Sequence, residues 1–188
     1  MPKKSIKPLT YIYPSPVMLI SSQGKDGKPN IATISWGGVL CSDPPIVGIS
    51  VRPTRHSNRL IKETMEFVLN IPSKNRLKET DYCGSVSGRD VDKFSGTGFT
   101  AEKSEKVKAP LIRECPINLE CQVKQILNLG SHDLFIAEVV AAHVDEEILE
   151  GDRISMDRLS PISYCPVVQE YRSMGEMIGS YGFSKKGK

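Results

Sequence analysis

The stretch Ile117-Asn-Leu-Glu-Cys-Gln-Val-Lys-Gln-Ile126 alternates apolar and polar residues and is the clearest strand pattern in the chain. Successive side chains of a strand point to opposite faces, so this period of two predicts a half-buried strand. Asn128-Leu-Gly-Ser-His-Asp133 follows as a turn, and the mostly apolar residues 134–142 return as a second strand. Residues 117–144 therefore predict a long antiparallel hairpin.

Shorter apolar runs on both sides of this hairpin predict further strands. They are bounded by typical turn residues and cover residues 16–22, 30–36, 46–51, 67–71 and 161–164. Gly37-Gly38 is expected to end the strand 30–36. Two short helices are predicted, one over 57–66 and one from Ser73, its expected N-cap, to about Cys83, with Gly84 as the stop. The glycine-rich, charged residues 85–98 read as a loop. This pattern predicts an antiparallel barrel or sandwich rather than a parallel βαβ sheet.

The composition bounds the class of protein. The chain has 188 residues, enough for one domain with a core of its own, and 39% are hydrophobic and 25% charged. The net charge is only +3 and aromatic residues make up 6%. A basic face interleaved with aromatics is therefore missing, which excludes typical nucleic-acid binding. No stretch approaches the ~20 apolar residues that a membrane span needs.

The cysteines argue for a reducing compartment. Their number is odd and the sequence has no Cys-x-x-Cys pair, which excludes a disulfide framework and a structural zinc site. Residues 1–16 are polar and interrupted by proline, unlike a signal peptide. We therefore expect a cytoplasmic protein with no metal site. Exposure is expected for Cys83 and Cys165 and burial for Cys121; the other two are Cys41 and Cys115.

A second stretch, Ile46-Val-Gly-Ile-Ser-Val-Arg-Pro-Thr-Arg-His-Ser-Asn58, has the layout of a strand, a turn and a helix start. A helix N-terminus leaves N–H groups unpaired and carries partial positive charge, so it suits an anion. Two arginines within four residues add donors with phosphate geometry. The stretch predicts a phosphate cradle, and the alternative is a solvated turn in which Ser57 caps the helix. Thr33 and Ser35 share one face of the strand 30–36, so their hydroxyls should face water or a ligand.

Six segments in the same order resemble one family. They are Asn30-x-Ala-Thr-x-Ser-Trp36, Pro44-Pro45-x-x-x-x-Ser50-Val-Arg-Pro-Thr-Arg-His-Ser57, Glu66-Phe-Val-Leu-Asn70, Ser87-Gly-Arg-Asp-x-Asp-Lys-Phe94, Gly130-Ser-His-Asp-x-Phe-Ile-Ala-Glu-Val139 and Tyr171-x-x-Met-Gly-Glu176. Together they resemble the flavin-reductase-like, FMN-binding split-barrel proteins, which include flavoredoxin and ferric reductase. Ala137 departs from the pattern, because many relatives have glycine there; we expect little effect.

The resemblance implies a mainly β fold: an antiparallel Greek-key split β-barrel with a few short helices. It implies an FMN-binding domain over residues 16–182, preceded by an N-terminal extension over 1–15 and followed by a basic C-terminal tail over 183–188. It also implies a homodimer with FMN near the interface. No Rossmann Gly-x-Gly-x-x-Gly is present, so NAD(P)H would bind only transiently.

The resemblance also implies roles for individual residues. His132 would be the catalytic residue beside the nicotinamide or flavin edge. Lys93 and Phe94 would close over the flavin. Asn30, Ala32, Thr33 and Ser35 would border the isoalloxazine. The phosphate segment would be Ser50, Val51, Arg52, Thr54, Arg55 and Ser57. Which of Arg52, Arg55 and His56 reaches the phosphate stays open.

Each of these residues has an ordinary structural alternative. Thr33 and Ser35 suit any barrel strand, and a lone histidine such as His132 often has no role in a turn. Lys93 could be a solvated lysine beside one buried aromatic residue, Phe94. Trp36 is expected in the core or an interface rather than on the flavin.

Three functions fit the resemblance. The first is a flavin or ferric reductase that passes electrons from NAD(P)H through FMN to an acceptor. The second is a flavoredoxin-like carrier without direct NAD(P)H activity, which would receive electrons from a redox partner protein. The third is an FMN-binding protein without turnover. In the first two, the cofactor supplies the redox chemistry and the protein supplies binding and electrostatics.

Overall fold

The computed structural model describes residues 1–185, and residues 186–188 of the expected basic tail lie outside this range. The predicted hairpin is confirmed: β9 (Ile117–Asn128) and β10 (Asp133–Val144) pair antiparallel, with Ile117 opposite Val144 and Asn128 opposite Asp133. The register shifts twice along β10, and such bulges bend and twist a strand pair. The long hairpin therefore curves around the core instead of lying flat.

Seven strands form one antiparallel sheet in the order β3-β2-β6-β9-β10-β5-β4. The remaining members are β2 (Met18–Gln23), β3 (Pro29–Ile34), β4 (Gly37–Ser42), β5 (Pro45–Val51) and β6 (Glu66–Ile71).

A two-residue link closes this sheet into a barrel. β3 and β4 lie at opposite edges, yet only Ser35 and Trp36 join them. So short a link spans at most about 10 Å, which forces the two edges together. The carbonyl of Trp36 accepts a hydrogen bond from the N–H of Ser50 at 2.7 Å. Gly37 and Gly38 were expected to end the preceding strand, but they begin β4. The preceding strand, β3, already ends at Ile34, before the link. The predicted mainly β split-barrel fold is confirmed.

Alternate residues of the strands fill the barrel. Phe67, Phe135, Ile20, Ile49 and Cys121 are fully buried and pack in one cluster. Each of these strands adds a further member two residues away: Met18, Val47, Val51, Leu69, Val123 and Ala137. This spacing is the pattern expected for one face of a sheet. Cys121 is a small buried hydrophobe, as predicted.

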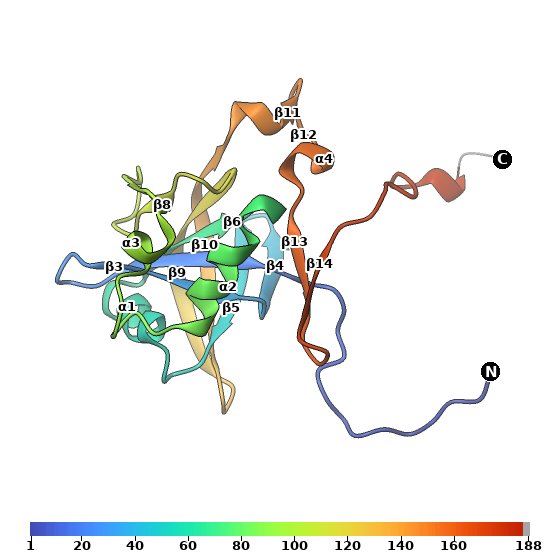
Figure 1. Cartoon of the computed structure of the whole chain (residues 1–188), viewed down its shortest axis with the longest axis horizontal. Helices are drawn as coiled ribbons and strands as arrows, with labels where there is room; N and C mark the ends of the chain where they lie inside the picture. The colour runs from blue at the N-terminus through green and yellow to red at the C-terminus, as the bar shows by residue number, and fades with distance from the viewer. Residues whose placement is uncertain (186–188) are drawn as a thin grey trace.

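Short helices cover the outside of β2 and β3 (Figure 1). They are α2 (Leu77–Ser85), preceded by the 3-10 turn Lys74–Arg76, and α3 (Lys93–Thr97). Leu19 and Ile31 point outward from the barrel and pack in a second cluster with Cys83. The expected exposure of Cys83 is therefore wrong, because α2 turns this thiol inward, and burial raises its pKa to about 11.

Three local predictions need correction. Ser73 makes no side-chain capping hydrogen bond. The helix α2 does not stop at Gly84 but ends one residue later, at Ser85. Gly84 faces Thr33. The expected loop 85–98 contains α3, because the carboxylate of Asp92 accepts hydrogen bonds from the N–H groups of Phe94 and Ser95 and so caps a helix there.

The outward face of β9 is buried in its first half, at Asn118 and Glu120, and open to solvent in its second half. The segment with the short strands β7 (Ala101–Glu102) and β8 (Leu111–Ile112) lies across it. Glu120 is fully buried there and accepts hydrogen bonds from three N–H groups, of Glu105, Lys106 and Val107, and one from His143. Burial alone would raise the pKa of Glu120, but these donors hold it below its ordinary value.

The C-terminal part forms a separate small sheet beside the barrel. β13 (Ile162–Cys165) pairs with β1 (Ser15–Pro16) and with β14 (Glu170–Ser173). The sequence predicted a strand over 161–164 but did not predict β14. Before it come the 3-10 turn Glu146–Ile148, β11 (Leu149–Glu150), β12 (Arg153–Ile154) and α4 (Met156–Leu159), and the 3-10 turn Phe183–Lys185 follows later.

Two extended segments, 1–14 and 174–182, run away from the barrel (Figure 1). Over residues 1–185, no helix has both the length and the apolar character needed to cross a membrane.

Candidate functional site

A cavity of about 640 Å³ lies outside the barrel, between β3, α2 and the C-terminal hairpin. It is lined by residues from six places: 30–36, 50–57, 81–88, Lys93, His132, and the hairpin with Tyr164 and Tyr171. These segments are distant in sequence and meet because β3 and β5 approach each other where the barrel closes. A cavity of this size accommodates a cofactor or another small organic molecule.

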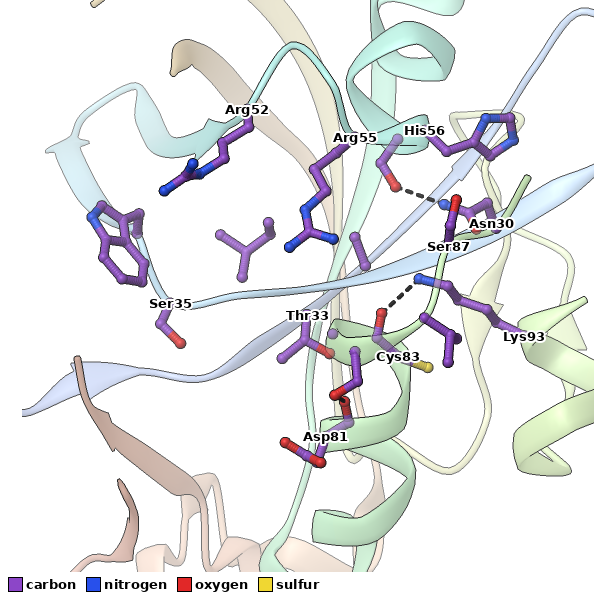
Figure 2. A pocket seen from close by; sticks show the side chains of 18 of the residues that line it. Asn30, Thr33, Ser35, Arg52, Arg55, His56, Asp81, Cys83, Ser87 and Lys93 are labelled. Atoms are coloured by element: carbon purple, nitrogen blue, oxygen red, sulfur yellow. Dashed lines mark hydrogen bonds between the residues drawn. The ribbon is translucent and has the colours of Figure 1, made fainter. Parts of the chain in front are cut away.

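The predicted cradle forms one wall of this cavity. The strand β5 ends at Val51, residues 52–55 turn, and α1 (His56–Thr64) begins. The N-cap residue, Arg55, makes no side-chain capping hydrogen bond, and the first turn holds no acidic residue. The positive end of the helix is therefore not neutralised locally. Figure 2 shows the guanidinium groups of Arg52 and Arg55 directed toward the strand with Thr33 and Ser35. Within residues 1–185, neither guanidinium makes an ion pair.

Ser57 does not cap the helix, so that alternative is wrong. It lies inside the first turn, is buried, and its hydroxyl oxygen accepts a hydrogen bond of 2.7 Å from the side chain of Asn30. Both residues line the cavity, as do the predicted Ser50 and Thr54. The serine hydroxyl keeps its own proton to donate to an anion.

The segment 84–88 lies against the cradle and completes this wall. A Cβ atom at Gly88 would lie only 1.8 Å from the side-chain oxygen of Asn30, so the close approach requires glycine. Ser85, Val86 and Ser87 also line the cavity but were not predicted there individually. The signal in the sequence was the glycine-rich composition that starts at Gly88.

The strand β3 borders the cavity with Ala32 and Ile34, and Ser35 of the link after it does the same. The hydroxyl of Thr33 behaves differently from the prediction, because it donates a 2.5 Å hydrogen bond to the carbonyl of Thr80 on α2. Thr33 also packs against Gly84. Its hydroxyl therefore fixes the helix to the strand, while Ser35 keeps a hydroxyl at the cavity wall.

Lys93 lines the cavity but its ammonium group is already engaged. It is buried and donates to the carbonyl of Ile31 at 2.8 Å and to that of Cys83 at 2.6 Å. Burial lowers the pKa of Lys93 to about 8. Lys93 therefore joins β3 to the end of α2, and one N–H remains for a ligand.

Two residues predicted to contact the cofactor lie elsewhere. Phe94 packs in the cluster under α2 and α3, and Val51 packs inside the barrel. Neither lines the cavity. Phe94 follows Lys93 on a helix, so its ring points into the layer that the helix covers. Val51 follows Ser50 on a strand, so its side chain points to the opposite face.

His132 stands at the edge of the cavity, at the tip of the long hairpin. Its ring stacks on Trp36, with ring centroids 6.3 Å apart and planes 12° apart. Burial, and then the positive charge of Arg52, lower the pKa of His132. Trp36 is exposed at the cavity wall and does not lie in the core; its expected place in an interface stays a prediction. His56 also lines the cavity, but in Figure 2 its ring is directed away from both guanidinium groups.

Asp133 was not predicted as part of the site, although it stands in the Gly-Ser-His-Asp segment. It is buried, and its carboxylate accepts hydrogen bonds from Asn58 at 2.9 Å, Lys62 at 2.7 Å and Asn128 at 3.0 Å. The first two of these residues belong to α1. The hydrogen bonds of Lys62 and Asn58 lower the pKa of Asp133 to about 2. Asp133 thus fixes the start of α1, and with it the cradle, to the hairpin.

Comparison with known proteins identifies the family. The flavin reductase like domain model matches residues 10–166. Flavoredoxin of Desulfovibrio vulgaris (Miyazaki F) is 33% identical, with a TM-score of 0.92 over 98% of this chain and 100% of that chain.

Two further relatives agree with this match. Flavoredoxin from Methanosarcina acetivorans is 31% identical, with a TM-score of 0.92 over 99% of this chain and 98% of that chain. A protein of Archaeoglobus fulgidus is 36% identical over 140 residues, which are 74% of this chain and 78% of the relative. The chain belongs to the flavin reductase like domain family.

Proposed function

We propose that this protein binds FMN and acts as an oxidoreductase of the flavin reductase type, with NAD(P)H as donor and a second compound as electron acceptor. One observation carries the proposal: Arg52 and Arg55 line the same cavity at the uncapped start of a helix. A phosphate group satisfies this set of donors, because guanidinium groups and helix N–H groups both favour a dianion.

The residues present fit FMN along the rest of the cavity. Ser50, Thr54 and Ser57 offer hydroxyls beside the two arginines. Asn30, Ala32 and Ser35 would border the ring, and the remaining N–H of Lys93 would donate to its polar edge. Bound FMN would supply the hydride and electron transfer, which no side chain of the site provides. His132 would orient a ligand over the open side of the cavity.

A flavoredoxin-like carrier is the second candidate function. The observation that favours it is the match over nearly the whole chain to two flavoredoxins at 33% and 31% identity. In this case a redox partner protein would take the place of NAD(P)H.

Anaerobic reduction separates the two candidates. Purified protein with bound FMN is mixed with NADH or NADPH, and the visible flavin absorption is followed with and without a ferric chelate. Bleaching by either nucleotide supports the reductase. A flavin band that neither nucleotide bleaches, but that dithionite does, supports the carrier. Protein that ignores added FMN contradicts both.

We also propose a cytoplasmic homodimer with the site near its interface. Support comes from apolar side chains that the single chain leaves exposed, such as Val39 and Leu40 on the edge strand β4 and Ile178 on the C-terminal segment. The five cysteines are free, which suits a reducing compartment. Sedimentation of the FMN-loaded protein tests the assembly: a monomer that holds FMN tightly would contradict it.

A further inference from the structure

The cavity has two chemically different ends. Arg52, Arg55 and Lys93 line one side, and the far side is formed by α2 and the C-terminal hairpin. Among the lining residues in the described part of the chain, Asp81 carries the only carboxylate. In Figure 2, Thr33 lies between Arg55 and Asp81. The side of the cavity opposite the cradle is therefore acidic.

The charge of Asp81 is not neutralised by a neighbouring cation. Within residues 1–185, no lysine or arginine forms an ion pair with it. Its one side-chain hydrogen bond comes from the hydroxyl of Tyr171, at 3.0 Å. This neutral donor orients the carboxylate at the cavity wall and leaves its charge in place.

Two tyrosine rings stand beside this carboxylate. Tyr164 of β13 and Tyr171 of β14 both line the cavity, with ring centroids 5.1 Å apart and planes tilted by 51°. Burial, and then the hydrogen bond to Asp81, raise the pKa of Tyr171 well above its ordinary value. Tyr171 therefore stays a neutral phenol that donates to a carboxylate, which makes its ring face more electron-rich.

We propose that Asp81, Tyr164 and Tyr171 form a binding subsite for a planar organic cation. Aromatic faces beside a carboxylate attract cations, whereas the negative charge of Asp81 repels a planar anion. The subsite goes beyond the proposed function, because none of its three residues belongs to the phosphate cradle. It makes Asp81 a specificity-determining residue for whatever enters this end of the cavity.

Three probes of similar planar shape and different charge test the subsite: benzamidine, which is a cation at neutral pH, neutral benzamide, and benzoate. Calorimetric titration of the FMN-loaded protein should give the tightest binding for the cation, weaker binding for the amide and the weakest for benzoate. Asp81→Asn should weaken binding of the cation by about five- to tenfold, as for loss of one partly exposed charge partner, and leave the amide within about twofold.

Glu79→Gln is the matched control. Glu79 lies on the same helix and its loss changes the net charge equally, but its carboxylate pairs with Arg76 at 3.8 Å and does not line the cavity. Its variant should bind all three probes like the wild type. Tyr171→Phe keeps the ring and removes only the hydrogen bond, so binding of the cation should persist.

Several results would overturn the subsite: equal affinities for the three probes, an equal loss in Glu79→Gln, or a loss in Tyr171→Phe as large as in Asp81→Asn. Binding of the cation only to FMN-free protein would also overturn it, because the flavin would then fill this end. If the protein does not bind FMN at all, the proposed function fails, and the order of the probes still decides the subsite.

Discussion

The arginines of the cradle and Lys93 are cations on the wall of one cavity, but the fold uses them differently. Arg52 and Arg55 are exposed and make no ion pair within residues 1–185. Lys93 is 5% exposed and donates to two backbone carbonyls. A cation on a cavity wall serves a ligand only with the donors that the fold has not already engaged.

The difference follows from where each residue stands in the chain. The arginines occupy a turn between β5 and α1, so their side chains leave the surface and can reach a ligand. Lys93 begins α3 between β3 and α2, where two strand and helix carbonyls need a donor. A buried carbonyl without a partner is costly, so the lysine becomes part of the fold.

Replacing Lys93 should give the largest effect, and it should be an effect on stability. Lys93→Met keeps the apolar stem but leaves the carbonyls of Ile31 and Cys83 unpaired, which we expect to lower the free energy of unfolding by about 2–4 kcal/mol. Denaturant titration measures this. Lys78→Met, an exposed lysine of α2, is the control and should change stability by less than about 0.5 kcal/mol. A Lys93→Met variant as stable as the wild type would show that the fold does not depend on Lys93.

Replacing Arg55 should affect binding instead. Arg55→Ala should weaken FMN binding by about 1.5–3 kcal/mol, the value of a charge-assisted hydrogen bond, with little change in unfolding. Fluorescence titration with FMN provides the affinity. The matched control is Arg59→Ala, because Arg59 lies on the same helix and pairs with Glu63 away from the cavity. If both variants bind FMN like the wild type, Arg55 is not a phosphate ligand.

Part of this site could be predicted because its signals are local. The alternation in β9 and the Ser-Val-Arg-Pro-Thr-Arg run each lie within one segment. The structure has a strand at the first and a strand, a turn and a helix start at the second, as expected. The roles of Thr33 and Lys93 could not be predicted this way, because their partners lie in other segments of the chain. Thr33 donates to Thr80, and Lys93 donates to Ile31 and Cys83.

The missed residues show the same limit. Asp81 and Tyr171 are separated by 90 positions, and only the docking of the C-terminal hairpin brings them together. The strand β14 has four residues, too few for a clear alternation, and α3 is hidden in a glycine-rich stretch where one capping aspartate decides the helix.

Asp133 is a charged residue that holds the cradle in place but does not line the cavity. Asp133→Asn should lower stability by about 1–2 kcal/mol at neutral pH, since the amide keeps only part of the hydrogen bonding of the carboxylate. The folded pKa of about 2 lies below the unfolded value, so this contribution is present above about pH 4 and is lost as the pH falls toward 2.

Unfolding curves of wild type and variant should therefore converge between about pH 4 and pH 2. Asp90→Asn, an exposed aspartate, should match the wild type at every pH. A gap between Asp133→Asn and the wild type that does not shrink in acid would show that the carboxylate charge is not what holds α1.

Parallel titrations with FMN and riboflavin decide whether the cradle recognises a phosphate, since the two ligands differ only in that group. Two arginines predict that the wild type binds FMN at least about 100-fold tighter than riboflavin. In Arg55→Ala the gap should narrow through weaker FMN binding, while the affinity for riboflavin stays unchanged. Wild-type protein that binds riboflavin as tightly as FMN would contradict the account.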